Sequence, residues 1–207
     1  LRFLLPDSFS KCLPAFVEFE QPLIVGFINR LPGRLFFTYA GFELTVFEFY
    51  LFEENYADAR KKVYRDLELS GGYNEDYHVL SGSFAEPVIG DIRRGVDASG
   101  IPVEFSKGEW GPGQHEINLR YAPALEMADR HVLYKQAAKE IAAAHEKSLT
   151  FMAKFDEELA GSSLHVHTSL WDGEGRPSFP GEIELAGTPA RSSETFRAFL
   201  AGWVAHV

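Results

Sequence analysis

Residues 109–116 read Glu109-Trp110-Gly111-Pro112-Gly113-Gln114-His115-Glu116, and this stretch decides the fold. Gly-Pro-Gly is a strong turn signal, so it should join two strands, at 102–105 and 115–121, into a hairpin. Because the turn folds the chain back, the carboxylates of Glu109 and Glu116 can converge on one point. Converging carboxylates repel unless they share a proton or bind a cation, and hard oxygen ligands suit Mg²⁺ or Mn²⁺. A solvated surface hairpin is the alternative, and this spacing alone leaves it open.

Short apolar runs and helical segments lie on both sides of this hairpin. Strands are expected at 16–19, 23–28, 35–39, 42–52 and 164–170, and helices at 56–69, 87–99 and 123–149. Pro87 and Pro123 would stand in the first turns of their helices, and Gly100 would cap a helix end. Residues 172–189 hold many of the remaining glycines and prolines and are expected to form loops.

A last helix is expected near the end of the chain, capped by Ser192 or Ser193. Its apolar face would comprise Phe196, Leu200, Trp203 and Val204. Strands interspersed with helices in this order predict an α+β fold dominated by an antiparallel sheet.

Residues 164–170 alternate between apolar and polar side chains, as a β-strand does. This period places His165, His167 and Ser169 on one face, where they could contact a metal or a phosphate. The preceding Gly161-Ser162-Ser163 segment offers backbone N–H groups to an anion. The polar face of an edge strand would look the same. A zinc site is less consistent with the sequence, because neither a cysteine pattern nor an HExxH motif accompanies the two histidines.

Glu48 stands inside an aromatic run, Phe-Glu-Phe-Tyr-Leu-Phe at 47–52. A carboxylate is costly to bury in such a strand unless it is paired or bound to a metal, so Glu48 is a further candidate ligand. Glu43 precedes it by an odd number of residues and would lie on the opposite face unless a β-bulge intervenes.

Composition excludes several classes of protein. The chain has 207 residues, 45% of them hydrophobic, and a formal net charge of -10, which opposes binding to the phosphate backbone of nucleic acids. The single cysteine, Cys12, rules out an internal disulfide framework and is typical of a buried, unreactive side chain in a reducing compartment. We find neither a signal peptide nor an apolar run long enough to cross a membrane. A cytoplasmic location without membrane or nucleic-acid partners is therefore expected.

Three segments in order, 109–121, 150–154 and 161–170, resemble consecutive signatures of the glutamine synthetase family. They are a Glu before a Gly-Gln-His-Glu strand, the sequence Thr150-Phe151-Met152-Ala153-Lys154, and Gly161-Ser162 followed by His165, His167 and Ser169. The resemblance covers about residues 47–171. Several motifs in one order are far more specific than any one of them.

The resemblance implies a catalytic domain with a largely antiparallel, curved sheet and flanking helices. It also implies an ATP-dependent ligase in which ATP phosphorylates the γ-carboxylate of glutamate. Ammonia or a small amine then displaces phosphate from the γ-glutamyl phosphate to form an amide. Mg²⁺ or Mn²⁺ would offset the phosphoryl charge. Members of the family assemble as stacked rings, so a homo-oligomer is implied as well.

Site residues carry over by motif position. Ligands of one metal would be Glu48, Glu109 and Glu116, and His165 would bind a second metal. Residues in contact with the nucleotide would be Glu104, Tyr121, His167 and Ser169. Gly161 would lie in the glutamate-binding loop.

Two positions depart from the family pattern. Val46 stands where the first strand usually carries another Glu ligand, and Ala160 replaces the Asn that usually precedes the substrate-loop glycine. The second departure is compatible with a relative that joins glutamate to a polyamine, ethanolamine or another amine. Both are also compatible with a non-catalytic family member that has a structural or regulatory role.

The resemblance also bears on domain organisation. Residues 1–40 would be a remnant of the N-terminal small domain or a linker, and 41–207 a partial catalytic domain. The family's glutamate- and phosphate-binding arginines, last metal-binding Glu and flap Glu are not found in this sequence. The sequence leaves open whether the chain is truncated, and we expect it by itself to bind metal without turnover.

Overall fold

The computed structural model describes residues 39–185 and 187–206. Cys12 and most of the strands expected before residue 40 lie outside this range, as does nearly all of the expected 1–40 segment. The chain divides into two compact units, one of Ala40–Ser169 and one whose described part is Tyr39 with 170–185 and 187–206.

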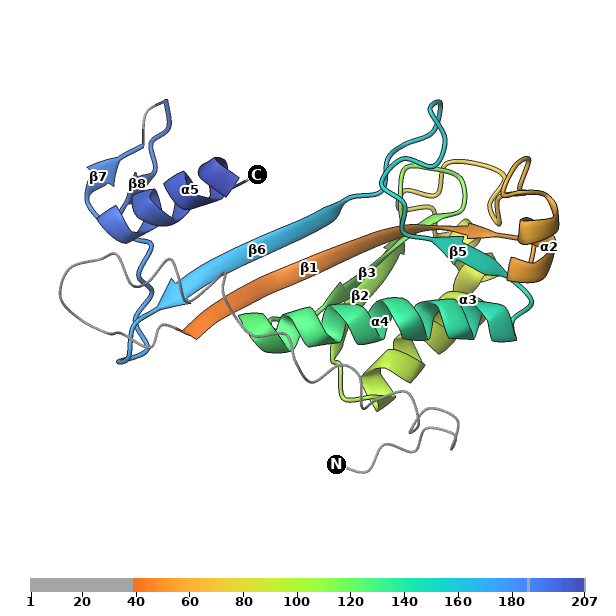
Figure 1. Ribbon diagram of the computed structural model, residues 1–207, viewed down its shortest axis with the longest axis horizontal. Coiled ribbons are helices and arrows are strands. Elements are labelled where there is room, and N and C mark those ends of the chain that lie inside the picture. Colours follow the sequence, from red (N-terminus) through yellow and green to blue (C-terminus); the bar gives the residue numbers. More distant parts are fainter. Residues whose placement is uncertain (1–38, 186, 207) are drawn as a thin grey trace. The chain divides into compact units, whose positions relative to one another are not determined.

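The larger unit combines one antiparallel sheet, whose strands differ in length, with two long helices (Figure 1). Its strands are β1 (Tyr39–Phe52), β2 (Val103–Gly108), β3 (Gln114–Leu119), β4 (Ala122–Pro123), β5 (Ser148–Thr150) and β6 (Leu164–Trp171), the last continuing into the second unit. Its helices are α2 (Tyr56–Lys61), α3 (Val79–Ala98) and α4 (Ala124–Ala144). The predicted α+β class with an antiparallel sheet is confirmed.

β1 is the strand around which the sheet is built. It pairs antiparallel with β3, β4 and β5, it also pairs with β6, and β2 completes the sheet by pairing with β3. The β2–β3 hairpin is the one that the Gly-Pro-Gly turn predicts. The antiparallel β1–β3 ladder sets Glu48 directly opposite Glu116.

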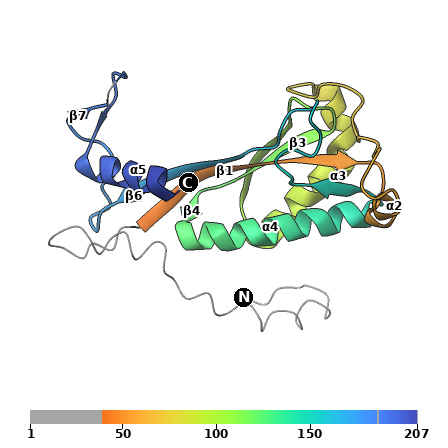
Figure 2. The same ribbon diagram turned by 45° about the horizontal axis from the view of Figure 1, so that its top comes forward.

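The two faces of β1 have different neighbours because successive side chains point to opposite sides of a strand. Phe47, Phe49 and Leu51 join the hydrophobic core, whereas Glu48 and Tyr50, though buried, are not part of it. The core is completed from α3, α4 and β3. In both ribbon views α4 runs alongside β1 (Figures 1 and 2), and Phe47 packs on His131 and Tyr134 of α4 at ring-centroid distances of 4.7 Å each.

Three predicted helix boundaries are wrong. Helix α3 begins at Val79, eight residues before Pro87, and runs through this proline. Pro87 lies on the exposed side, so water can solvate the Ser83 carbonyl that loses its helical partner. Gly100, with a φ of 81°, follows α3 as expected. Helix α2 ends at Lys61 because Val63 and Tyr64 adopt left-handed backbone conformations.

Helix α4 ends at Ala144 and not at 149, because the chain turns there and enters strand β5. Pro123 is its N-cap residue. Strand β6 forms as predicted, but Leu164 and Val166 remain 47% and 37% exposed. The apolar side chains of this part of β6 are therefore partly open to solvent.

The second unit contains strands β7 (Ile183–Glu184) and β8 (Arg191–Ser192), which pair as a short hairpin, and helix α5 (Glu194–His206). Ser193 caps α5, since its Oγ accepts a hydrogen bond of 3.1 Å from the backbone N–H of Phe196. Phe179 packs against Phe196 and Phe199. None of the helices in the described ranges combines the length and apolarity that a membrane span requires.

Candidate metal centre

Three carboxylates meet on the face of the sheet opposite the hydrophobic core. Glu48 belongs to β1, Glu109 to the β2–β3 turn and Glu116 to β3, and one oxygen from each lies within 4.8 Å of the others. Glu48 and Glu116 are 8% and 6% exposed. Like charges directly opposite each other on neighbouring strands destabilise a sheet. This arrangement therefore requires a proton or a cation, and the surface-hairpin alternative is wrong.

The tight turn brings Glu109 to the cluster. The backbone N–H of Glu109 donates to the Gln114 carbonyl at 2.7 Å, and Gln114 donates to the Gly111 carbonyl at 3.0 Å. A Cβ at Gly111 would lie 2.0 Å from the Tyr50 hydroxyl, and Gly113 has a φ of 68°. Both positions thus require glycine, one for close packing and one for its backbone conformation.

Protonation couples two of the carboxylates. Burial and the hydrogen bond with Glu109 raise the pKa of Glu116 to about 7. Burial alone would raise the pKa of Glu109 as well, but hydrogen bonds from Glu116 and Lys107 hold it below its usual value. Asn118 donates a hydrogen bond of 2.5 Å to Glu116. A proton held by Glu116 and shared with Glu109 therefore relieves the repulsion near neutral pH when no cation is bound.

Lys107 supplies positive charge that sequence reasoning missed. Its ammonium forms an ion pair with Glu109 and lies 3.9 Å from Glu116 and 3.2 Å from Asp76. Lys107 and Glu116 are cross-strand partners in the β2–β3 ladder, which explains their proximity. The donor set of three carboxylates thus already holds one cationic group, and its oxygen ligands fit Mg²⁺ or Mn²⁺.

Glu48 also contacts the loop that precedes β6. Its carboxylate accepts hydrogen bonds from the backbone N–H of Ser163, at 2.9 Å, and from the Ser163 hydroxyl. Gln114 joins the same loop by donating to the Gly161 carbonyl at 3.0 Å and to Glu48 at 3.3 Å. The Tyr50 hydroxyl donates to the Ala160 carbonyl at 2.8 Å. The Gly161 loop is therefore attached directly to the carboxylate cluster.

The other predicted site residues lie outside this cluster. His165 and His167 are exposed on β6, and Ser169 on the same strand is half-buried. Among the described residues, no third metal-binding side chain joins the two histidines. Tyr121 is 70% exposed, and Glu104 stands at a β-bulge of β2, where it lines a groove with Arg93 and Arg94. The structure thus brings together the three carboxylates and the Gly161 loop, and leaves the other five roles as predictions.

Cation binding to this cluster should depend on pH. The pKa of Glu116 is raised to about 7, so at lower pH this carboxyl is protonated and a cation must displace its proton. The Mn²⁺ affinity should therefore rise with pH, by up to about tenfold per unit, and level off once Glu116 is ionised. Isothermal titration calorimetry in buffers of different ionisation enthalpy would count the released protons. A pH-independent affinity without proton release would contradict the assignment of Glu116 as a ligand.

Known proteins resemble this chain in sequence and in fold. Residues 28–207 match the family described as glutamine synthetase, catalytic domain. The chain is 43% identical over 175 residues to the γ-glutamylethanolamide synthetase GlnA4 of Streptomyces coelicolor, which covers 84% of the chain and 36% of that protein. It is 39% identical over 167 residues to a glutamate–isopropylamine ligase of a Pseudomonas species, covering 81% of the chain and 35% of that protein.

A solved structure of GmaS without ligand has a similar fold, with a TM-score of 0.66 and 28% identity over 82% of the chain and 37% of GmaS. The chain therefore spans little more than a third of the length of these relatives. The family match, in contrast, extends over most of the chain. The chain belongs to the glutamine synthetase family and carries part of its catalytic domain.

Proposed function

We propose that the protein to which this chain belongs is an ATP-dependent ligase that joins the γ-carboxylate of glutamate to a small amine through γ-glutamyl phosphate. One observation carries the proposal. In a chain of this family, Glu48, Glu109 and Glu116 come from separate parts of the sequence and converge within 4.8 Å. A buried group of three carboxylates without a cation is unfavourable, and Mg²⁺ or Mn²⁺ would complete it.

In this proposal Glu48, Glu109 and Glu116 hold the cation. When bound, the cation offsets negative charge on the transferring phosphoryl group. Asn118 orients the Glu116 carboxylate through its hydrogen bond. Gln114 and Ser163 hold the Gly161 loop beside the cluster, where glutamate would bind. The glutamate-binding loop and the metal ligands would therefore be held in place by one hydrogen-bonded group.

The remaining roles follow from the family. His165 would bind a second cation. Contacts to ATP would come from Glu104, Tyr121, His167 and Ser169. Among the solved relatives, a GmaS complex with ADP has a TM-score of 0.65 to this chain, at 28% identity. The full protein would be a homo-oligomer of stacked rings that works in the cytoplasm.

An amine, and not ammonia alone, is the favoured acceptor. Ala160 lacks the amide side chain that the family usually places before the substrate-loop glycine, so a contact to glutamate is changed in this loop. Two of the relatives, at 43% and 39% identity, are named for ligation of ethanolamine and isopropylamine to glutamate. Small primary amines such as these are the substrates to test first.

An amine panel tests this function. Full-length protein with ATP, Mg²⁺ and glutamate should release phosphate and form a γ-glutamyl amide with at least one small primary amine, and faster than with ammonia. The isolated 207-residue chain should bind Mn²⁺ but release no phosphate. Metal binding by the full protein without amide formation from any amine would instead support the non-catalytic alternative that Val46 and Ala160 suggest.

A further inference from the structure

Lys107 occupies the place of a cation at the candidate metal centre. Its ammonium forms an ion pair with Glu109 and lies 3.9 Å from the nearer carboxylate oxygen of Glu116. The side chain is only 21% exposed, so its charge is partly shielded from water. Two of the three clustered carboxylates are therefore neutralised in part by a group that belongs to the chain itself.

The same ammonium has a second set of partners that do not belong to the cluster. It donates a hydrogen bond of 3.2 Å to Asp76, and it lies 4.8 Å from the centroid of the Tyr77 ring. Tyr77 adopts a left-handed backbone conformation with a φ of 55°, which side-chain-bearing residues rarely adopt. Tyr77 is 77% exposed and does not belong to the hydrophobic core, so its ring lies beside Lys107 at the surface. An anionic and an aromatic partner together form a binding position for an ammonium.

We propose that Lys107 is an internal counter-ion that competes with the divalent cation for Glu109 and Glu116. It moves fully to Asp76 and Tyr77 when the cation binds. The inference rests on the proposed function, because it assumes that the three carboxylates bind Mg²⁺ or Mn²⁺. Lys107 thereby lowers the affinity for the cation and limits repulsion between the carboxylates when the cation is absent.

A matched pair of lysine substitutions tests the competition. Lys107→Gln should bind Mn²⁺ about tenfold more tightly than the wild type, because both the competitor and its repulsion of the cation are removed. Lys147→Gln is the control, since Lys147 is 22% exposed, pairs with Glu53 at 2.6 Å and changes the net charge equally. The control should change the affinity by less than about twofold. Binding is measured by Mn²⁺ electron paramagnetic resonance at fixed ionic strength.

Asp76→Asn tests the second position of the ammonium. In the wild-type background it should weaken Mn²⁺ binding about threefold, because the displaced ammonium loses its partner. In the Lys107→Gln background the same substitution should have little effect. An equal loss in both backgrounds would show that Asp76 attracts the cation directly and would overturn this part of the inference.

The outcomes separate the two proposals. Absence of Mn²⁺ binding to both the wild type and Lys107→Gln would contradict the metal centre and hence the proposed function. Wild-type binding that Lys107→Gln leaves unchanged or weakens would contradict the counter-ion role alone. Circular dichroism of each variant checks that the fold is retained.

Discussion

Replacing Glu116 by Gln should weaken Mn²⁺ binding by about 100-fold or more, since loss of even an indirect partner of a metal ligand costs 10- to 100-fold. The substitution keeps the size of the side chain and the ability to hydrogen-bond, so the loss would come from the missing anionic oxygen. Glu116 is 6% exposed and lies directly opposite Glu48 in the β1–β3 ladder. Titration calorimetry of both proteins measures the effect.

In the absence of metal, the same substitution should increase the stability of the fold above neutral pH. The pKa of Glu116 is raised to about 7, so between about 4.5 and 7 the folded state binds this proton more tightly than the unfolded state. Stability from this group is therefore present at low pH and lost as pH rises through 7. Metal-free Glu116→Gln should thus melt at a higher temperature than the wild type at a pH of about 8.

Glu126→Gln is the control for both measurements. Glu126 is an exposed residue of α4 that pairs with Arg130 at 2.6 Å, and its loss should change metal affinity and melting temperature little. An apo Glu116→Gln protein that is less stable than the wild type at this pH would argue against repulsion in the cluster. Unchanged Mn²⁺ affinity would exclude Glu116 as a ligand.

The second large effect concerns the core that supports the cluster. Phe49→Ala should reduce the free energy of unfolding of the 40–169 unit by about 3–5 kcal/mol, because it leaves a cavity in a packed core. Phe49 is fully buried, and its ring lies 5.4 Å from that of Phe151 between ring centroids. Glu48 and Tyr50 flank it in the sequence, so the same strand carries the core and the site.

Hydrogen exchange of amides in β3 and α3 is the suitable measurement, because it reports on this unit without the second one. Phe84→Ala provides the comparison: Phe84 is 77% exposed on α3, and its replacement should change stability by no more than about 0.5 kcal/mol. Equal effects of the two substitutions would show that β1 does not anchor the core.

The parts of the fold that depend on neighbouring residues could be predicted from the sequence. The Gly-Pro-Gly turn needs only its own residues to reverse the chain, so the β2–β3 hairpin and the meeting of Glu109 with Glu116 follow from it. The aromatic run around Glu48 predicts β1, and a carboxylate inside it predicts a partner. The family signatures, which extend over much of the chain, then identify the domain.

Features that depend on distant partners could not be predicted. Lys107 looks like any charged residue on a strand until pairing with β3 places it across from Glu116. Ser163 lies 115 residues from Glu48 in the sequence, so no local pattern relates them. The sequence pattern does not predict the start of α3, because Pro87 resembles a first-turn proline and the actual N-cap, His78, is an uncommon capping residue.

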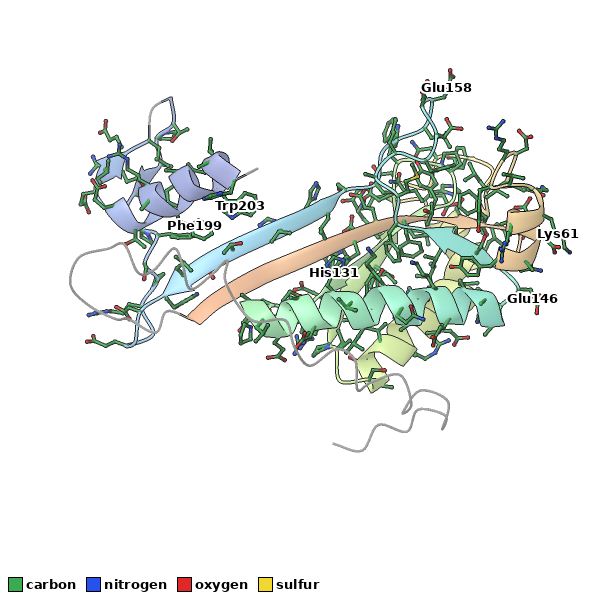
Figure 3. The ribbon with its side chains drawn as sticks, in the orientation of Figure 1. Lys61, His131, Glu146, Glu158, Phe199 and Trp203 are labelled. Atoms are coloured by element: carbon green, nitrogen blue, oxygen red, sulfur yellow. The ribbon has the colours of Figure 1, made fainter. Side chains whose placement is uncertain are left out.

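The direct opposition of Glu48 and Glu116 has a consequence for insertions and deletions. A shift of one residue in the pairing of two strands moves every side chain of one strand to the other face of the sheet. Adding or removing a single residue within β1 or β3 would therefore send one carboxylate into the hydrophobic core and bring an aromatic or aliphatic side chain to the cluster. Length changes among related chains should accordingly fall in exposed segments such as 62–66 and 156–158, whereas these two strands keep their length even where their sequences diverge. Figure 3 shows Glu158 at the tip of the second of these loops, where added residues would extend into solvent.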